Sequence, residues 1–302
     1  MLREIVFVQE AIFIEDYFSM VEKIWPIGVF TSIDAGLGVR LEVASQLKIP
    51  TIQLHTPMRE GRTPQMASGF IKSLDELGIE LTCVFGGFEG ESYADIPTVE
   101  RTVGLVPPES RASRLQEMKE ISDFARLLGC NVIGLHLGVV PHDRNCKDYA
   151  EIIHVTRQLC DHASSNEQSV HLETGQETAE SLRHFILDTQ RANLYINFDP
   201  ANMILYGMGN PIEALDVIGE YVRSVHCKDG LWSDQPGVSW GREVPLGEGD
   251  VGIEAYLNKL KEIGYRGPLT IEREIPQEPE RQMAEIEHAS NLLRALSEKI
   301  WR

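Results

Sequence analysis

Four ionisable residues stand at the ends of successive apolar runs in the second half of the chain. They are Glu173 in SVHLE, Asp199 in NLYINFD, His226 in RSVHC and Glu272 in PLTIE. Three carboxylates and one imidazole form a donor set that suits a divalent cation of intermediate hardness, such as Mn²⁺, Mg²⁺, Co²⁺ or Zn²⁺. Without a cation, carboxylates that converge in a region of low dielectric constant would repel one another until one took up a proton. The residue types therefore predict one divalent metal ion, provided that the fold brings the four together.

Each of these residues, taken alone, also has a purely structural interpretation. Asp199 precedes Pro200, which has no N–H to donate to a strand ladder, and both residue types are common in turns that end strands. Any one of the four could equally form a salt bridge at the rim of the fold. Their recurrence at the ends of consecutive strands favours the metal site, with Pro200 redirecting the chain behind a ligand.

The elements that must position these residues alternate along the chain. Eight short apolar runs are typical of strands: 27–34, 51–56, 79–88, 131–138, 169–175, 193–200, 223–230 and 268–274. Helical patterns lie between them, as in SRLQEMKEISDFARLLG, where apolar residues recur at steps of three or four. Eight such units predict an α/β fold of the (β/α)8 type, a TIM barrel with parallel strands. An open doubly wound sheet is the alternative, but the chain lacks the full glycine-rich phosphate loop that usually follows the first strand of that fold.

The predicted domain organisation is a single catalytic barrel over 27–302, preceded by a short, helical N-terminal extension over 1–26. Within the strands, residues two apart share a face, so His171 lies with Glu173 and Asn197 with Asp199. The residues between them, such as Leu172, then face the helices. Active sites of TIM barrels lie at the C-terminal ends of the strands. The candidate ligands are expected there, with His171 and Asn197 as candidates to hold them in place.

Five motifs near the predicted strand ends together resemble the xylose isomerase-like TIM barrel superfamily: HLETG, NFDPAN, VHCKDG, PLGEGDVG and LTIERE. This superfamily includes tagatose-type 3-epimerases, sugar-phosphate 3-epimerases, inosose isomerases and dehydratases, and the AP endonuclease IV enzymes. The resemblance covers the chain from about residue 27 to about residue 295. It implies that Glu173, Asp199, His226 and Glu272 bind one divalent metal ion. It also implies that the two glutamates are acid/base catalysts, as they are in the 3-epimerases.

Two departures from the family pattern argue against the endonuclease reaction. Asn202 stands where the epimerases and endonucleases usually carry a histidine, and Asp229 is not followed by the histidine of a typical trinuclear endonuclease site. An amide can hydrogen-bond a substrate oxygen, but it is a poor ligand for a second metal ion. The formal net charge of −18 further opposes binding to phosphate backbones. No nucleic-acid partner is therefore expected.

Other polar and aromatic residues near the predicted strand ends are candidates for substrate binding: His55, His136, Asn202, Lys228, Trp232 and Arg242. The histidines would bond substrate hydroxyls or shuttle protons, the lysine and arginine would meet negative charge, and a tryptophan would stack on a sugar ring. Each also has a structural alternative: a satisfied barrel histidine, a lysine paired with Glu272 or Asp199, a tryptophan that packs its loop, or a surface arginine. The segment FGGFEGESYAD is expected to cover the mouth of the barrel, with Phe88 as a contact. Asp250 is expected to cap the helix that begins near Ile253.

The predicted function is that of a metal-dependent sugar or sugar-phosphate isomerase or epimerase that works through an enediolate. A dehydratase of the inosose or dehydroshikimate kind on the same metal site is the alternative. An AP endonuclease IV-like nuclease and a non-catalytic barrel that binds a metal and a sugar are weaker alternatives. The expected partner is a small molecule: a keto sugar, a sugar phosphate or a cyclic polyol ketone. A homo-oligomer remains open.

Composition fits this interpretation. The chain of 302 residues is 42% hydrophobic and 25% charged, as in globular proteins. It has no apolar run of about 18 residues and no secretory signal, so neither a membrane partner nor export is expected. The five cysteines form no CxxC pair, which indicates reduced thiols. A cytoplasmic location is the resulting prediction.

Overall fold

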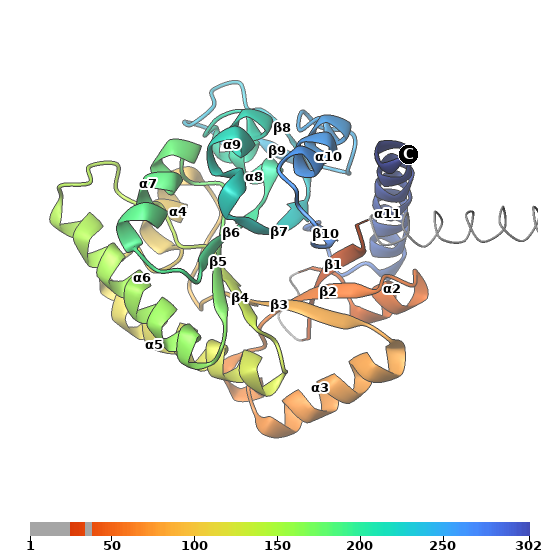
Figure 1. Ribbon diagram of the computed structural model, residues 1–302, viewed down its shortest axis with the longest axis horizontal. Helices are drawn as coiled ribbons and strands as arrows, with labels where there is room; N and C mark the ends of the chain where they lie inside the picture. The colour runs from red at the N-terminus through yellow and green to blue at the C-terminus, as the bar shows by residue number, and fades with distance from the viewer. Residues whose placement is uncertain (1–24, 34–37) are drawn as a thin grey trace, which may run out of the picture.

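Eight parallel strands form a closed barrel in the computed structural model, which describes residues 25–33 and 38–302 (Figure 1). The strands are β1 (Ile27–Ser32), β2 (Thr51–His55), β3 (Glu80–Gly86), β4 (Val132–Leu135), β5 (Ser169–Glu173), β6 (Leu194–Phe198), β7 (Val222–Cys227) and β10 (Leu269–Ile271). Their order around the barrel is β1-β10-β7-β6-β5-β4-β3-β2. The α/β fold of the (β/α)8 type is confirmed, and each of the eight predicted runs contains or overlaps one barrel strand. The extension over 1–26 lies outside the described residues except for its last two, so it and the domain boundary stay predictions.

Helices surround the barrel (Figure 1). They are α2 (Leu41–Gln46), α3 (Pro64–Leu77), α4 (Ile96–Thr102), α5 (Pro108–Leu127), α6 (Lys147–Ser165), α7 (Ala179–Thr189), α8 (Pro200–Tyr206), α9 (Pro211–Ile218), α10 (Ile253–Glu262) and α11 (Pro279–Trp301), with short 3₁₀ turns at Arg59–Gly61 and Gly219–Tyr221. Side chains that accept backbone N–H groups start several of them, including Thr63 at α3 and Thr178 at α7. Within the part of the chain that the structure describes, no helix combines the length and apolar character needed to span a membrane.

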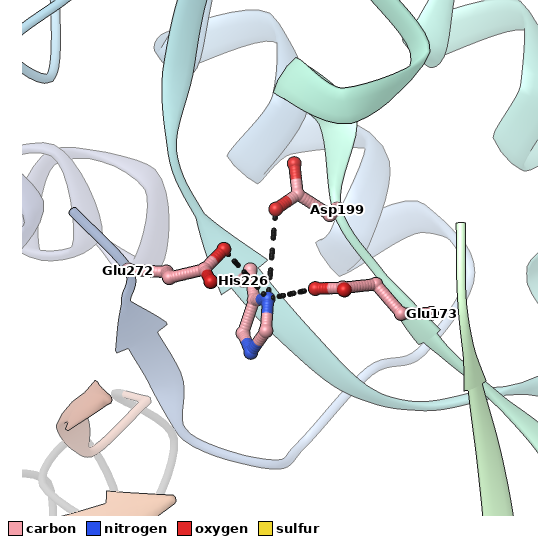
Figure 2. A group of neighbouring side chains, drawn as sticks. All are labelled: Glu173, Asp199, His226 and Glu272. Carbon is pink, nitrogen blue, oxygen red and sulfur yellow. Dashed lines mark ion pairs between the residues drawn. The ribbon is translucent and has the colours of Figure 1, made fainter. Parts of the chain in front are cut away.

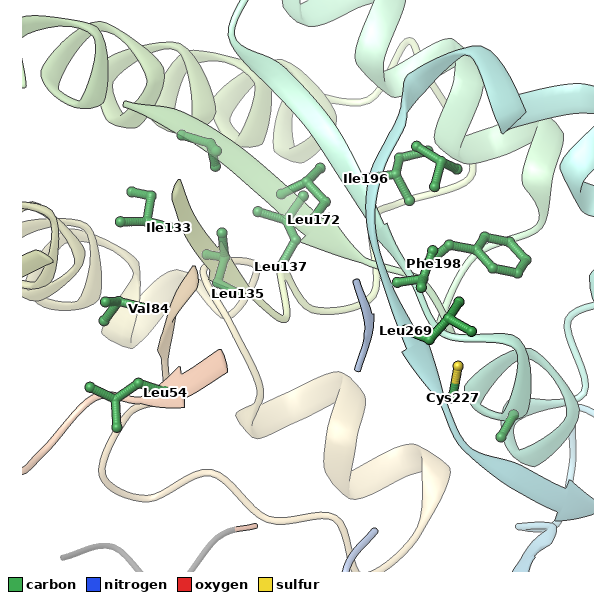
Figure 3. Close-up of a cluster of buried hydrophobic side chains, with 14 of the residues drawn as sticks. Leu54, Val84, Ile133, Leu135, Leu137, Leu172, Ile196, Phe198, Cys227 and Leu269 are labelled. Carbon is green, nitrogen blue, oxygen red and sulfur yellow. The ribbon is translucent and has the colours of Figure 1, made fainter. Parts of the chain in front are cut away.

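The hydrophobic core lies between the barrel and the helices. Strand residues such as Leu54, Val84, Ile133 and Ile196 are fully buried there (Figure 3). Leu172, which separates the inward-facing His171 and Glu173, belongs to the same core. The predicted alternation of inward polar and outward apolar residues therefore holds on β5. Burial of the apolar face fixes the register of each strand, because a shift by one residue would turn the polar residues toward the helices.

A two-stranded antiparallel sheet follows β7 and was not predicted from the sequence. It consists of β8 (Asp229–Leu231) and β9 (Arg242–Val244). The carboxylate of Asp229 anchors the segment that follows, because it accepts backbone N–H groups from Gly230, Gly247, Gly249 and Val251 at 2.9 to 3.2 Å. A Cβ atom at position 249 would collide with this carboxylate. The glycines of this segment therefore allow its backbone N–H groups to surround the buried Asp229 carboxylate.

Helix α10 corrects one prediction. Its N-cap residue is Gly252, at a φ of 72°, and not Asp250. The Asp250 side chain instead accepts the backbone N–H of Trp232 at 3.0 Å. Both aspartates thus stabilise the region around β8 and β9, rather than the start of the helix.

Candidate metal centre

The four predicted ligands come together at the C-terminal ends of four neighbouring strands (Figure 2). Glu173 is the last residue of β5, Asp199 follows β6, His226 lies near the end of β7 and Glu272 follows β10. Their ligand atoms all lie within 4.8 Å of one another. His226 Nδ1 is at the centre, 2.6 Å from Glu173 Oε1, 3.2 Å from Glu272 Oε2 and 3.5 Å from Asp199 Oδ2.

The bonding of these atoms fits a metal ion. His226 Nδ1, Glu173 Oε1 and Asp199 Oδ2 are buried and make no hydrogen bond of normal geometry; their contacts are the ion pairs with one another. Buried polar atoms whose hydrogen-bonding capacity is unused are costly, and native proteins have few of them. Together with the Glu272 carboxylate they lie within 4.8 Å of one another, close enough for one cation to bind all four residues. The donor set of three carboxylates and one imidazole suits Mn²⁺, Mg²⁺, Co²⁺ or Zn²⁺.

Burial and neighbouring charges shift the pKa values of these residues when no cation is bound. Burial raises the pKa of Asp199 to about 6. Burial also opposes ionisation of Glu173, but the charges of His136 and His226 bring its pKa down to about 2. The pKa of His226 would fall on burial, but Glu272 and Glu173 raise it well above its usual value. Asp199 is therefore the carboxylate that most readily takes up a proton when no cation is bound.

Asp199 has a separate task for each of its two oxygens. Oδ1 accepts the backbone N–H of Asn202 at 2.9 Å and caps α8, in which Pro200 is the first residue. Oδ2 faces His226 and the other ligands. Proline is favoured at this first helical position because its missing N–H would have no partner there. One oxygen of this aspartate therefore caps the helix, as the turn interpretation expects, and the other is left facing the remaining candidate ligands.

Each of the two glutamates has a second, basic neighbour. Glu173 Oε2 lies 2.7 Å from His136 Nε2. Glu272 Oε2 lies 3.2 Å from Lys228 Nζ, which also contacts Glu274 at 3.0 Å. Burial would lower the pKa of Lys228, but Glu272 and the other carboxylates raise it well above its usual value. Lys228 is therefore a buried cation held beside the cluster.

A cavity of about 510 Å³ opens next to the cluster. Glu173 and Glu272 line it, as do five of the residues predicted to bind substrate: His55, His136, Asn202, Lys228 and Arg242. Trp232 does not line the cavity. Trp240 does, and its ring lies edge-on to Tyr206, with 4.5 Å between the ring centroids. The tryptophan that could contact a sugar is therefore Trp240.

The segment after β3 forms part of the cavity wall through Glu91 and Tyr93. Phe88 does not line the cavity; it is buried beneath the guanidinium of Arg114. The carboxylate of Glu91 accepts backbone N–H groups from Phe88 at 3.0 Å and Gly104 at 2.7 Å. These bonds hold the segment against the chain around residue 104 and make it a preformed wall.

Some residues around the site were missed or misjudged from the sequence. Gln53 bonds His226 and was not singled out, although it lies two residues before His55 on β2 and so shares its face. Asn197 bonds Gln53 rather than a ligand. His171 contacts Ser169 and Ser224. The hydrogen bond to the candidate ligand His226 therefore comes from across the barrel, which no local pattern shows.

Residues 41–296 match the family model described as xylose isomerase-like TIM barrel. The chain belongs to this family. A xylose isomerase domain protein from Planctomyces limnophilus, known from a crystal structure, is 61% identical in sequence to this chain. The two structures superpose with a TM-score of 0.90 over 92% of this chain and 99% of that one. A D-tagatose 3-epimerase-like protein is 19% identical, with a TM-score of 0.68 over 91% and 99% of the two chains. A xylose isomerase-like protein from Mycobacterium smegmatis, in complex with magnesium, is 17% identical, with a TM-score of 0.66 over 91% and 98%. The last two likenesses concern the fold.

Two curated relatives match parts of the chain. A segment of 98 residues, 32% of the chain, is 36% identical to an uncharacterized protein of Methanocaldococcus jannaschii. An alignment 148 positions long, which covers 44% of the chain, is 27% identical to an inosose dehydratase of Clostridium botulinum. These matches span 31% and 49% of the length of the two relatives.

Proposed function

We propose that this protein is a divalent-metal-dependent isomerase or epimerase that acts on a keto sugar or sugar phosphate through an enediolate. The observation that carries the proposal is the group of buried ligand atoms without hydrogen bonds, next to a cavity that two glutamates line. Family membership supports an enzyme, since similar structures include a D-tagatose 3-epimerase-like protein. A cyclic polyol ketone also has the carbonyl and adjacent hydroxyl that this site would need.

Glu173 and Glu272 are the proposed acid and base. They reach the site from β5 and from the end of β10, and both line the cavity. Nearby positive charge lowers both pKa values, so at neutral pH both are ionised and ready to accept a proton. A divalent ion held by the four ligands would polarise the substrate carbonyl and stabilise the enediolate. One glutamate would remove the proton beside the carbonyl, and the other would return it to the opposite face.

The remaining residues of the cavity would bind and orient the substrate. His136 and Lys228 would each hold one glutamate and donate hydrogen bonds to substrate oxygens. Arg242 would meet a phosphate or carboxylate at the far end of the substrate. Asn202 lies at the start of α8 beside the cavity and would bond a hydroxyl.

A dehydratase acting on the same site is the second candidate. The observation that favours it is the pairing of Glu173 with a group that can donate a proton, His136, at 2.7 Å. Expulsion of a β-hydroxyl requires such an acid in addition to a base. The partial match to an inosose dehydratase supports this candidate in the same way.

Proton NMR in heavy water would separate the candidates. The metal-loaded protein would be incubated with ketopentoses, ketohexoses, their phosphates and inososes. An epimerase should place deuterium at the carbon beside the carbonyl and invert that centre. A dehydratase should produce an unsaturated ketone and release water. Failure to turn over or exchange any member of this panel would contradict the proposed function and favour a non-catalytic metal- and sugar-binding barrel.

A further inference from the structure

Gln53 links two sides of the barrel interior directly behind the metal centre. It lies on β2, is 1% exposed, and reaches across to β7, where its Oε1 is 2.9 Å from His226 Nε2. Its Nε2 donates to Asn197 Oδ1 on β6 at 3.1 Å. The side chain therefore bonds the ligand histidine from the side opposite to the three carboxylates.

The chemistry of this bond decides which nitrogen of His226 is free to bind a cation. An amide oxygen can only accept, so His226 Nε2 must carry the proton in this bond. In a neutral imidazole the other nitrogen, Nδ1, then has a lone pair. Nδ1 is the atom that faces Glu173, Asp199 and Glu272. Metal-binding histidines commonly donate their other N–H in this way, which fixes both the tautomer and the ring orientation.

The orientation of the Gln53 amide is itself controlled. If the amide were reversed, its NH₂ group would face His226 Nε2, and the imidazole proton would move to Nδ1, where it would block a cation. In the observed arrangement Asn197 Oδ1 accepts the NH₂ group of Gln53, so a reversal of Gln53 would require the Asn197 amide to turn as well. The ring of His226 also packs against both Phe30 and Phe85, at centroid distances of 5.6 and 5.5 Å. These contacts leave the imidazole little room to rotate.

We propose that Gln53 is a positioning residue that sets the tautomer of His226 so that Nδ1 can bind the metal ion. This inference rests on the metal centre of the proposed function, but it concerns a residue that touches neither metal nor substrate. Such outer hydrogen bonds commonly change metal affinity by about 10- to 100-fold. Gln53→Met, which keeps the shape but loses the acceptor, should therefore bind Zn²⁺ about 10- to 100-fold more weakly than the wild type.

Two further variants make the test specific. Thr51 lies on β2 like Gln53 and is also buried, but it is distant from the ligand bonds. Thr51→Val removes the hydrogen bond that the Thr51 hydroxyl donates to Ile27 O on β1. It should lower stability without weakening Zn²⁺ binding. Gln53→Glu keeps an acceptor for His226 and should retain near-native affinity, because Asn197 has an unused buried Nδ2 that can turn to donate to the new carboxylate.

The measurements are titration with Zn²⁺ in competition with a chelator, and long-range ¹H–¹⁵N NMR of the histidines in the Zn²⁺-loaded protein. The wild type should show His226 with its proton on Nε2. Equal affinity of Gln53→Met and the wild type, an equal loss in Thr51→Val, or a proton on Nδ1 of His226 would each overturn the inference. Absence of Zn²⁺ binding by the wild type would instead sink the metal centre itself, and the inference with it.

Discussion

At the scale of single residues, the site combines groups that would be unfavourable together without a cation. The predicted donor set is brought together with its ligand atoms within 4.8 Å, and two of the carboxylates keep pKa values below the usual range. Asp199 is the exception. Its carboxylate caps α8 and faces the other candidate ligands, but burial disfavours its ionised form in the metal-free fold.

Asp199→Asn should stabilise the metal-free protein at neutral pH. Burial raises the folded pKa of Asp199 from 3.8 to about 6, so ionisation disfavours the folded state. This penalty is absent below pH 3.8, grows as the pH rises toward 6 and is complete above it. An amide removes it, keeps an oxygen to cap α8, and should add up to about 3 kcal/mol at pH 8. Urea unfolding with a chelator at pH 4 and pH 8 tests this, and an equal effect at both values would contradict it.

Glu173→Gln and Glu272→Gln should separate catalysis from metal binding. Each change keeps an oxygen ligand but removes the proton acceptor, so turnover should fall by about two orders of magnitude or more. Metal content should fall less. In heavy water, the variant that lacks the base for a given epimer should not exchange its α-proton, whereas the other variant should exchange it without inversion. Near-native epimerisation by both metal-loaded variants would mean that these glutamates are only ligands.

The convergence of the four candidate ligands could be predicted because it depends on local signals. Glu173, Asp199 and Glu272 each end an apolar run, and strands in a closed barrel all end at the same rim. Gln53 and Glu243 could not be found in this way. Gln53 bonds residues of β6 and β7, and Glu243 reaches Lys228 and Arg273 from β9. Contacts between elements distant in sequence depend on the closed barrel and not on any local pattern.

At the scale of elements, the β8–β9 sheet shapes one side of the cavity. Trp240, Arg242 and Glu243 line the cavity, and the last two belong to β9 itself. The sequence did not predict this sheet, because each strand has only three residues and the pattern of alternation is too short to detect. The role of Asp229 was missed for the same reason: its partners are backbone N–H groups, which no residue type reveals.

Asp229→Ala should loosen this sheet without removing a metal ligand. Several buried N–H groups would lose their acceptor, at a total cost on the order of 3 kcal/mol after partial rescue by water. The expected result in steady-state kinetics is a raised KM, with metal affinity close to that of the wild type. Asp250→Ala, which loses one bond at an exposed site, is the matched control and should cost less than about 1 kcal/mol. Equal destabilisation by the two variants would contradict the anchoring role of Asp229.

At the scale of the whole molecule, the negative net charge disfavours polyanionic partners such as nucleic acids. The formal net charge of −18 repels polyanions at long range, and a small substrate can enter a cavity that a duplex cannot. We expect no measurable binding to duplex DNA at physiological salt and no nicking of abasic DNA. A mobility-shift assay over a range of salt concentrations tests this. Tight, salt-sensitive binding or nicking would show that Asn202 and Asp229 had been wrongly judged to exclude the endonuclease reaction.

The central claim is that one divalent ion binds between four residues from four neighbouring strands. Anomalous diffraction from crystals soaked in Mn²⁺ tests it most directly, because the peak reports the ion itself. The account predicts one strong peak among Glu173 Oε1, Asp199 Oδ2, His226 Nδ1 and Glu272 Oε2, and its loss in crystals of Asp199→Ala. An empty cluster at saturating Mn²⁺, or a peak held by other residues, would contradict it.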